Sequence, residues 1–129
     1  MTIESSTIHG TTYGVYSNSA KPDTITNSTI TSTSTAFYKY NLGKSTITNT
    51  TINGQTYNNK TGAVLEITGG TINGLTNNVG NTTIKNANIE YESNVNNHEY
   101  QIRNSGLLTL QENTIKYKNY TYLTNGYQH

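Results

Sequence analysis

The spacing between large aliphatic residues constrains the fold of this chain more than any other feature. An isoleucine or leucine is followed five positions later by isoleucine in the pairs Ile3/Ile8, Ile25/Ile30, Ile47/Ile52, Ile67/Ile72, Ile84/Ile89 and Leu110/Ile115. Successive pairs lie 22, 22, 20, 17 and 26 residues apart. A fixed short spacing inside a variable longer period indicates a solenoid, in which each turn keeps one constant segment and its loops absorb the differences in length.

The residues within the repeat predict two strands that meet at a sharp corner. The units read TIESSTI, TITNSTI, TITNTTI, EITGGTI, TIKNANI and TLQENTI. Their β-branched residues favour strand over helix. Two inward residues on one strand are separated by an even number, so a separation of five requires a bend between them. Asn or Gly two positions after the first aliphatic residue, followed by a small residue, is typical of such a bend. Stacked turns would align Asn27, Asn49 and Asn86 in a ladder of side-chain amides.

The remainder of each turn is less regular and predicts a third strand. Segments such as YGVYSN and AFYKYN are expected to contribute inward residues to the core, namely Val15, Phe37, Ile102 and Leu123. A second corner with positive φ is expected where glycine precedes the next pair, at Gly43, Gly62, Gly80 and Gly106. The longest turn, which starts at Ile84, is expected to bulge outward at residues 92–99.

Turns of this length with a short Asn-containing bend resemble the right-handed parallel β-helix of the pectate-lyase-like superfamily. Units such as EITGGTI also resemble repeats of large bacterial surface and adhesin-like proteins. The resemblance covers residues 1–129 as a single all-β domain and implies about six turns of 17–26 residues. It also implies an extracellular or cell-surface bacterial location. Lyases, phage tailspikes and adhesins share this fold, so the resemblance implies no particular activity.

The two ends of the chain predict exposed edges. Ile3 is already in register with the repeat, and neither end shows a polar capping helix. Both end turns would then present unpaired backbone groups. We therefore expect either end-to-end self-association or a segment cut from a longer array.

Composition and charge exclude several classes of partner. The net charge is +1 with no basic cluster, so the electrostatic footprint of a nucleic-acid-binding protein is missing. The sequence contains no apolar run long enough to span a membrane. The first ten residues, MTIESSTIHG, do not have the pattern of a signal peptide. Cysteine is absent, which excludes disulfides and cysteine-based zinc sites.

Catalytic residues are sparse in the sequence. Polysaccharide lyases and hydrolases need clustered carboxylates, often with a basic residue, whereas this chain has one aspartate, Asp23, and one arginine, Arg103. Glu92, His98 and Glu99 share the bulging turn and form a candidate metal or proton-transfer site; a solvent-exposed insertion is the simpler interpretation. We expect no catalysis, metal or cofactor in this segment. The alternative is a fragment of a polysaccharide-active lyase or hydrolase whose catalytic residues lie outside it.

Charged residues at one repeat position predict a weak surface contact. Glu90 and Lys116 each follow the second isoleucine of a pair, in successive turns. Stacking would place them close together as a surface ion pair worth at most about 1 kcal/mol.

Tyrosines provide the best candidate for a recognition surface. Tyrosine accounts for 11 residues, and the less regular segments carry Tyr13, Tyr16, Tyr38, Tyr40 and Tyr57. If these rings align on one face, they form an amphipathic aromatic surface suited to carbohydrate or to a host or cell-surface protein. The alternative is that they fill the third wall of the core or shield a sheet edge. The sequence therefore predicts a structural or adhesive rod segment with a possible glycan-binding face.

Threonine pairs raise a third function. Thr24/Thr26 and Thr46/Thr48 resemble the Thr-x-Thr arrays of ice-binding β-solenoids. In later turns one member is replaced, in Glu66/Thr68, Thr83/Lys85 and Thr109/Gln111. Threonine is also a good strand residue, which is the simpler explanation of the pattern.

Overall fold

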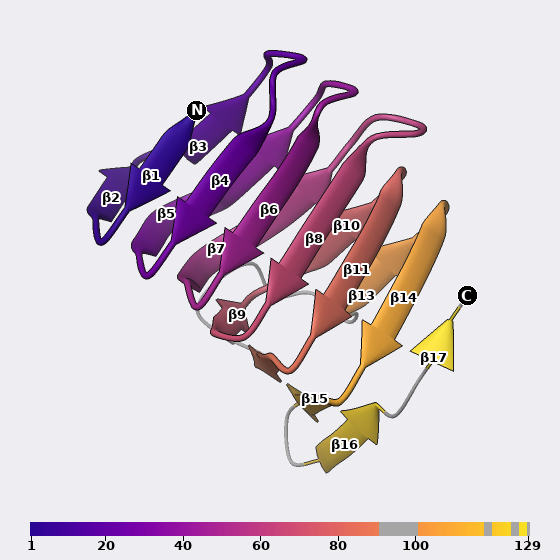
Figure 1. The fold of residues 1–129 in the computed structure, drawn as a ribbon. Helices are drawn as coiled ribbons and strands as arrows, with labels where there is room; N and C mark the ends of the chain where they lie inside the picture. The colour runs from indigo at the N-terminus through magenta and orange to yellow at the C-terminus, as the bar shows by residue number, and fades with distance from the viewer. Residues whose placement is uncertain (91–100, 118–119, 125–126, 129) are drawn as a thin grey trace.

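The chain folds into a right-handed parallel β-helix with two main sheets (Figure 1). The structure, a computed structural model, describes residues 1–90, 101–117, 120–124 and 127–128. The first sheet contains the strand that begins each repeat: β1 (Thr2–Glu4), β4 (Asp23–Thr26), β6 (Lys44–Thr48), β8 (Val64–Thr68), β11 (Asn81–Lys85) and β14 (Leu107–Gln111). No strand of this sheet pairs with its neighbour in sequence, because the chain visits the second sheet between visits to the first.

The second sheet contains the strands that follow the corner. They are β2 (Thr7–Gly10), β3 (Tyr13–Ser17), β5 (Thr29–Lys39), β7 (Thr51–Asn58), β9 (Thr71–Asn73), β10 (Thr76–Asn78), β12 (Asn88–Glu90), β13 (Ile102–Asn104) and β15 (Asn113–Tyr117). In β5 and β7 the predicted second and third strands are continuous. In the other turns they are separate strands of the same sheet, and we call the part formed by β3, β10, β13 and the ends of β5 and β7 the third wall.

The aliphatic pairs build the core in the register predicted from their spacing. The first members align from Ile3 to Leu110 along the first sheet, and the second members align from Ile8 to Ile115 along the second. In the middle turns these side chains are fully buried. The stack makes about five turns, slightly fewer than the number of pairs, because the last pair starts a turn that the chain does not complete.

The corner is a left-handed residue two positions after the first aliphatic residue in every unit. Asn27, Asn49 and Asn86 have φ of 50°, 48° and 53° there, and Gly69 has φ of 71°. Asn and Gly are the residues that adopt this conformation most easily. Ser5 and Glu112 adopt it as well, at 46° and 54°, because the paired strands on both sides fix the bend.

The small residue after the corner faces inward and connects successive turns. The backbone N–H of Ser6 donates to Ser28 Oγ at 3.0 Å, and the N–H of Ser28 donates to Thr50 Oγ1 at 3.4 Å. Asn113 supplies its side-chain oxygen to the N–H of Ala87 at 2.9 Å in the same way. Serine, threonine and asparagine at this position thus supply acceptors inside the bend for the backbone of the neighbouring turn.

The predicted ladder through Asn27, Asn49 and Asn86 is not found. A left-handed corner residue points its side chain outward, and all three are exposed. The amide ladders of the described residues run through the strands instead. Outside the coil, Asn73 Nδ2 donates to Asn53 Oδ1 at 2.5 Å. Inside it, Asn58, Asn78 and Asn104 are linked by bonds of 3.3 and 2.7 Å.

The third wall matches its prediction in part. Val15 and Phe37 are buried and Ile102 packs against the core, but Leu123 is 78% exposed. Leu123 lies in β16 (Tyr120–Thr124), which runs antiparallel to β15 instead of continuing the coil. At the second corner, positive φ is found for Gly62 only. The other three glycines are needed for close backbone contact: a Cβ on Gly106 would lie 2.2 Å from the carbonyl oxygen of Gly80.

The two ends differ, contrary to the prediction that both expose unpaired edges. At the C-terminal end, β16 pairs with β15, and β17 (Tyr127–Gln128) pairs antiparallel with β14. This reversal covers β14 and β15 (Figure 1), whereas β13 pairs with β10 only among the described residues. At the N-terminal end, β1, β2 and β3 each pair on one side only.

Candidate functional site

The tyrosines of the third wall gather on its outer face. Tyr16, Tyr38 and Tyr57 are Cα partners in three successive turns, on β3, β5 and β7. Each follows an inward residue of its strand, and strand alternation therefore turns it outward. Tyr13, at the start of β3, lies beside them. We call Tyr13, Tyr16, Tyr38 and Tyr57 the tyrosine strip.

The rings of the tyrosine strip pack against one another. Tyr16 and Tyr38 are stacked, with ring centroids 5.1 Å apart and planes at 18°, and Tyr38 and Tyr57 lie 5.6 Å apart at 40°. Tyr13 meets Tyr16 edge-on at 5.0 Å and Tyr38 at 5.5 Å. Such contacts hold the rings in place before any ligand binds. They also cover ring faces, so the strip presents mainly ring edges and hydroxyl groups to solvent.

Polar groups orient the strip and extend it along the rod. Asn59 Nδ2 donates to Tyr38 Oη at 2.8 Å, which leaves the hydroxyl proton of Tyr38 available to another acceptor. Beyond Tyr57 the same column continues with Asn77 and then Arg103 in the next two turns. The surface therefore changes from aromatic to amide to cationic along the axis.

Tyr40, the fifth predicted residue of this surface, has a different neighbour. It follows the end of β5, is 45% exposed, and has Lys60 Nζ 4.6 Å from its ring centroid. This cation–π contact places a positive charge at the edge of the surface. Tyr120 and Tyr122 are exposed too, but they lie on β16 at the C-terminal end.

The predicted loop site, Glu92, His98 and Glu99, lies outside the described residues. Its base is described: the Gln101 side-chain amide donates to the Glu90 carbonyl at 2.7 Å, and the flanking strands β12 and β13 keep their register. The outward bulge predicted at residues 92–99 also lies outside the described residues. Within the described residues, no group of three or more His, Asp or Glu side chains is placed to hold a metal ion.

Glu90 and Lys116 lie side by side on neighbouring strands, as their repeat position predicted. The two residues are Cα partners on β12 and β15. The ion pairs formed by the described residues lie elsewhere: Lys44 to Glu66 at 3.4 Å, and the Met1 amine to Asp23 at 3.6 Å.

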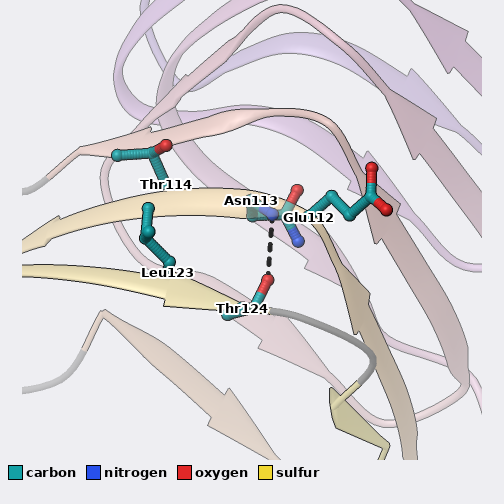
Figure 2. Close-up of a pocket in the computed structure, with 5 residues that line it drawn as sticks. All are labelled: Glu112, Asn113, Thr114, Leu123 and Thr124. Carbon is teal, nitrogen blue, oxygen red and sulfur yellow. Dashed lines mark hydrogen bonds between the residues drawn. The ribbon is translucent and has the colours of Figure 1, made fainter.

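A hollow of about 320 Å³ opens at the C-terminal end between β15 and β16 (Figure 2). It is lined by Glu112, Asn113, Thr114, Leu123 and Thr124, and the Asn113 N–H donates to Thr124 Oγ1 across it at 3.0 Å. Glu112 is the one titratable side chain among these residues. The described residues that line the hollow therefore do not include the paired carboxylates of glycoside hydrolysis.

A threonine column runs along the outer face of the first sheet. Thr2, Thr24, Thr46, Glu66, Thr83 and Thr109 are Cα partners in successive strands. The adjacent column, two residues further along each strand, holds Thr26, Thr48 and Thr68 in its middle. The alignment inferred from the sequence is thus present, and Glu66, which forms an ion pair with Lys44, interrupts the first column.

Sequence reasoning missed a buried polar seam, formed by Ser17, Asp23, Lys39, Asn41 and Ser45. Lys39 is fully buried, and its Nζ donates to Asn41 Oδ1 at 2.6 Å. Burial lowers the pKa of Lys39, and the nearby Asp23 carboxylate partly offsets this effect. Asp23 Oδ2 accepts hydrogen bonds from the hydroxyls of Ser17 and Ser45. The burial of Lys39 could have been predicted from the sequence. Phe37 was expected to face inward, and strand alternation then turns Lys39, two residues later, inward as well.

Comparison with known proteins does not assign this chain to a family. No protein-family model matches the chain, no curated protein is significantly similar to it, and no solved structure matches it. Among the described residues, no helix has the length and apolar character needed to cross a membrane. Any function must therefore be argued from the surfaces described above.

Proposed function

We propose that this chain is a non-catalytic rod segment of an extracellular or cell-surface protein, and that its tyrosine strip binds an extended carbohydrate. The observation that carries this proposal is the in-register packing of Tyr16, Tyr38 and Tyr57 on one outer face of the coil, with Tyr13 packed beside them. The alternative, a lyase or hydrolase fragment, would require catalytic groups outside the described residues.

The chemistry of the strip suits a sugar chain lying along the rod. Successive strands are about 4.8 Å apart, so the strip offers a tyrosine edge and hydroxyl at each of three turns. Sugars present hydroxyls and apolar C–H groups side by side, which matches the amphipathic character of tyrosine. Because the rings already hold one another, little side-chain entropy is lost on binding.

The shape of the strip favours a chain-like ligand over a protein. A standard protein interface uses about 20–30 residues on each side. The strip is narrow and long, with four rings and the flanking Asn59 and Asn77. An extended ligand can contact these ring edges and amides together, whereas the strip alone supplies too few residues for a standard protein interface.

Removing a central ring should weaken this binding. Tyr38 touches the other three rings, so we expect Tyr38→Ala to lower glycan affinity about tenfold or more, as for aromatic anchors at the centre of other interfaces. Binding is measured first on an array of bacterial, plant and animal polysaccharides and then by calorimetry with the best binder. Tyr122→Ala, on the separate hairpin, is the matched control and should bind normally. Absence of binding to every polysaccharide, or normal binding by Tyr38→Ala, would contradict the proposal.

The threonine column favours a second candidate, ice binding. Aligned threonines on a sheet form a regular array of methyl and hydroxyl groups. Glu66 interrupts the column, so Glu66→Thr should increase thermal hysteresis, while Thr46→Lys should abolish it. Nanolitre osmometry of the purified chain measures this, and a wild-type protein without hysteresis would eliminate the candidate.

A further inference from the structure

We propose that Lys39 and Asn41 become joined by an intramolecular amide bond, formed when Lys39 Nζ displaces ammonia from the Asn41 side chain. The reaction would take place inside the coil, in the polar seam behind the second corner of its turn. The proposal is independent of glycan binding and rests on the arrangement of nucleophile, carbonyl and leaving group.

The nucleophile lies against the carbonyl that it would attack. Lys39 Nζ is 2.6 Å from Asn41 Oδ1. Since a C=O bond is about 1.23 Å long, Nζ is at most about 3.8 Å from the carbonyl carbon. Reacting atoms in near-attack arrangements lie about 3–3.5 Å apart, so a small rotation of the lysine suffices. Burial disfavours the ammonium form of Lys39 and lowers its pKa, which favours the nucleophilic amine.

The carbonyl is polarised by a fixed donor. The backbone N–H of Gly43 donates to Asn41 Oδ1 at 2.8 Å, so it would stabilise negative charge that develops on this oxygen. Gly43 is held tightly, because a Cβ at this position would lie 2.5 Å from the Ala20 carbonyl oxygen. The donor is therefore in place before the reaction begins.

The leaving nitrogen is connected to a carboxylate. Asn41 Nδ2 donates to Ser17 O at 2.9 Å and to Ser17 Oγ at 2.8 Å. The Ser17 hydroxyl in turn donates to Asp23, which is 3% exposed and also accepts from Ser45 Oγ at 2.9 Å. Ser17 thus links the departing amine to a buried proton acceptor.

The step balances without any co-reactant. Asp23, the carboxylate whose charge acts on Lys39, takes up one ammonium proton, and the resulting amine attacks the Asn41 side-chain carbonyl carbon. The new bond joins Nζ to this carbon, and the bond from the carbon to Nδ2 breaks. One further Nζ proton passes to Nδ2, which leaves as ammonia and takes the proton stored on Asp23. The products are a secondary amide, an ammonium ion and Asp23 in its original carboxylate state.

Replacing the ammonium by an amide removes a poorly solvated charge from the interior. A buried charge is unfavourable unless it is fully paired, and the hydrogen bond of Lys39 Nζ goes to a neutral amide oxygen. The product keeps the carbonyl oxygen within reach of the Gly43 N–H. It would also tie the end of β5 to the corner that follows it.

Intact-mass measurement of the purified full-length chain tests the proposal. We expect a mass lower than that of the sequence by one ammonia. We also expect trypsin to leave the Lys39 bond uncut after unfolding, and fragment spectra to show no cleavage between residues 39 and 41. A wild-type chain with the full sequence mass would overturn the proposal.

Matched variants separate this bond from succinimide formation at asparagine, which also releases ammonia. Lys39→Arg preserves the positive charge but cannot form the bond, so its mass should equal that calculated from its sequence. Lys44→Arg, at an exposed lysine, should lose one ammonia as the wild type does. A loss of ammonia that persists in Lys39→Arg would overturn the proposal. Asp23→Asn preserves the shape of the acceptor and should slow the reaction at least tenfold; an unchanged rate would remove Asp23 from the mechanism.

Discussion

Replacing Ile47 by alanine is expected to lower the free energy of unfolding by about 2–5 kcal/mol. Ile47 is fully buried, and its Cα partners in the turns on either side are Ile25 and Ile67. The substitution therefore leaves a cavity that borders two turn-to-turn contacts in the middle of the stack. A solenoid is stabilised mainly by such contacts between neighbouring turns, so a gap in the centre weakens the whole array.

The same substitution at the open end is the matched control for Ile47. Ile3 occupies the equivalent position in the first turn, but it is half-buried and has a partner strand on one side only. We expect Ile3→Ala to lower the free energy of unfolding by about 1 kcal/mol. Urea unfolding followed by circular dichroism measures both variants. Equal losses would show that the stack is not stabilised turn by turn.

The aliphatic spacing predicted the core well because it is a geometric constraint. A separation of five cannot place two residues on the same side of one strand, so a corner had to lie between them. The left-handed residue at that corner could be predicted where it is Asn or Gly. Ser5 and Glu112 have no such local preference, and the paired strands on both sides impose the bend there.

The C-terminal turn could not be predicted because its repeat pattern continues while its fold does not. Leu123 occupies a position comparable to Phe37 and Ile102, yet β16 reverses and pairs antiparallel with β15. A strand at the end of a stack has no following turn to cover it. Antiparallel pairing with β16 satisfies its backbone groups instead. No residue pattern in the repeat predicts this reversal of the chain.

The candidate site was predicted in part. Strand alternation around Val15 and Phe37 turned the neighbouring tyrosines outward, and four of the five named tyrosines pack together. The covering of one ring face by the next depends on side-chain rotamers and could not be predicted. The polar seam was missed because a lysine is rarely buried, although its place in the alternation pointed inward.

Substituting Gly70 by alanine is expected to lower the free energy of unfolding by about 3 kcal/mol or more. Gly70 has φ of 77°, a conformation that is unfavourable for an L-residue with a side chain by about 1–2 kcal/mol. Its added Cβ would also lie 2.2 Å from the carbonyl oxygen and 2.7 Å from the nitrogen of Thr50, in the turn below. Both atoms belong to backbone, so two turns must move apart to make room.

Gly62→Ala isolates the conformational part of this effect. Gly62 has φ of 82°, close to that of Gly70, but the nearest atom to its added Cβ is Leu42 Cδ2 at 3.7 Å. The strain of the left-handed conformation is therefore common to both variants, while the contact with a neighbouring turn occurs only in Gly70→Ala. We expect Gly62→Ala to lose about 1 kcal/mol in the same urea titration. Equal losses of stability in the two variants would contradict this explanation. They would show that the left-handed backbone conformation, and not the close contact with Thr50, is the reason for glycine at position 70.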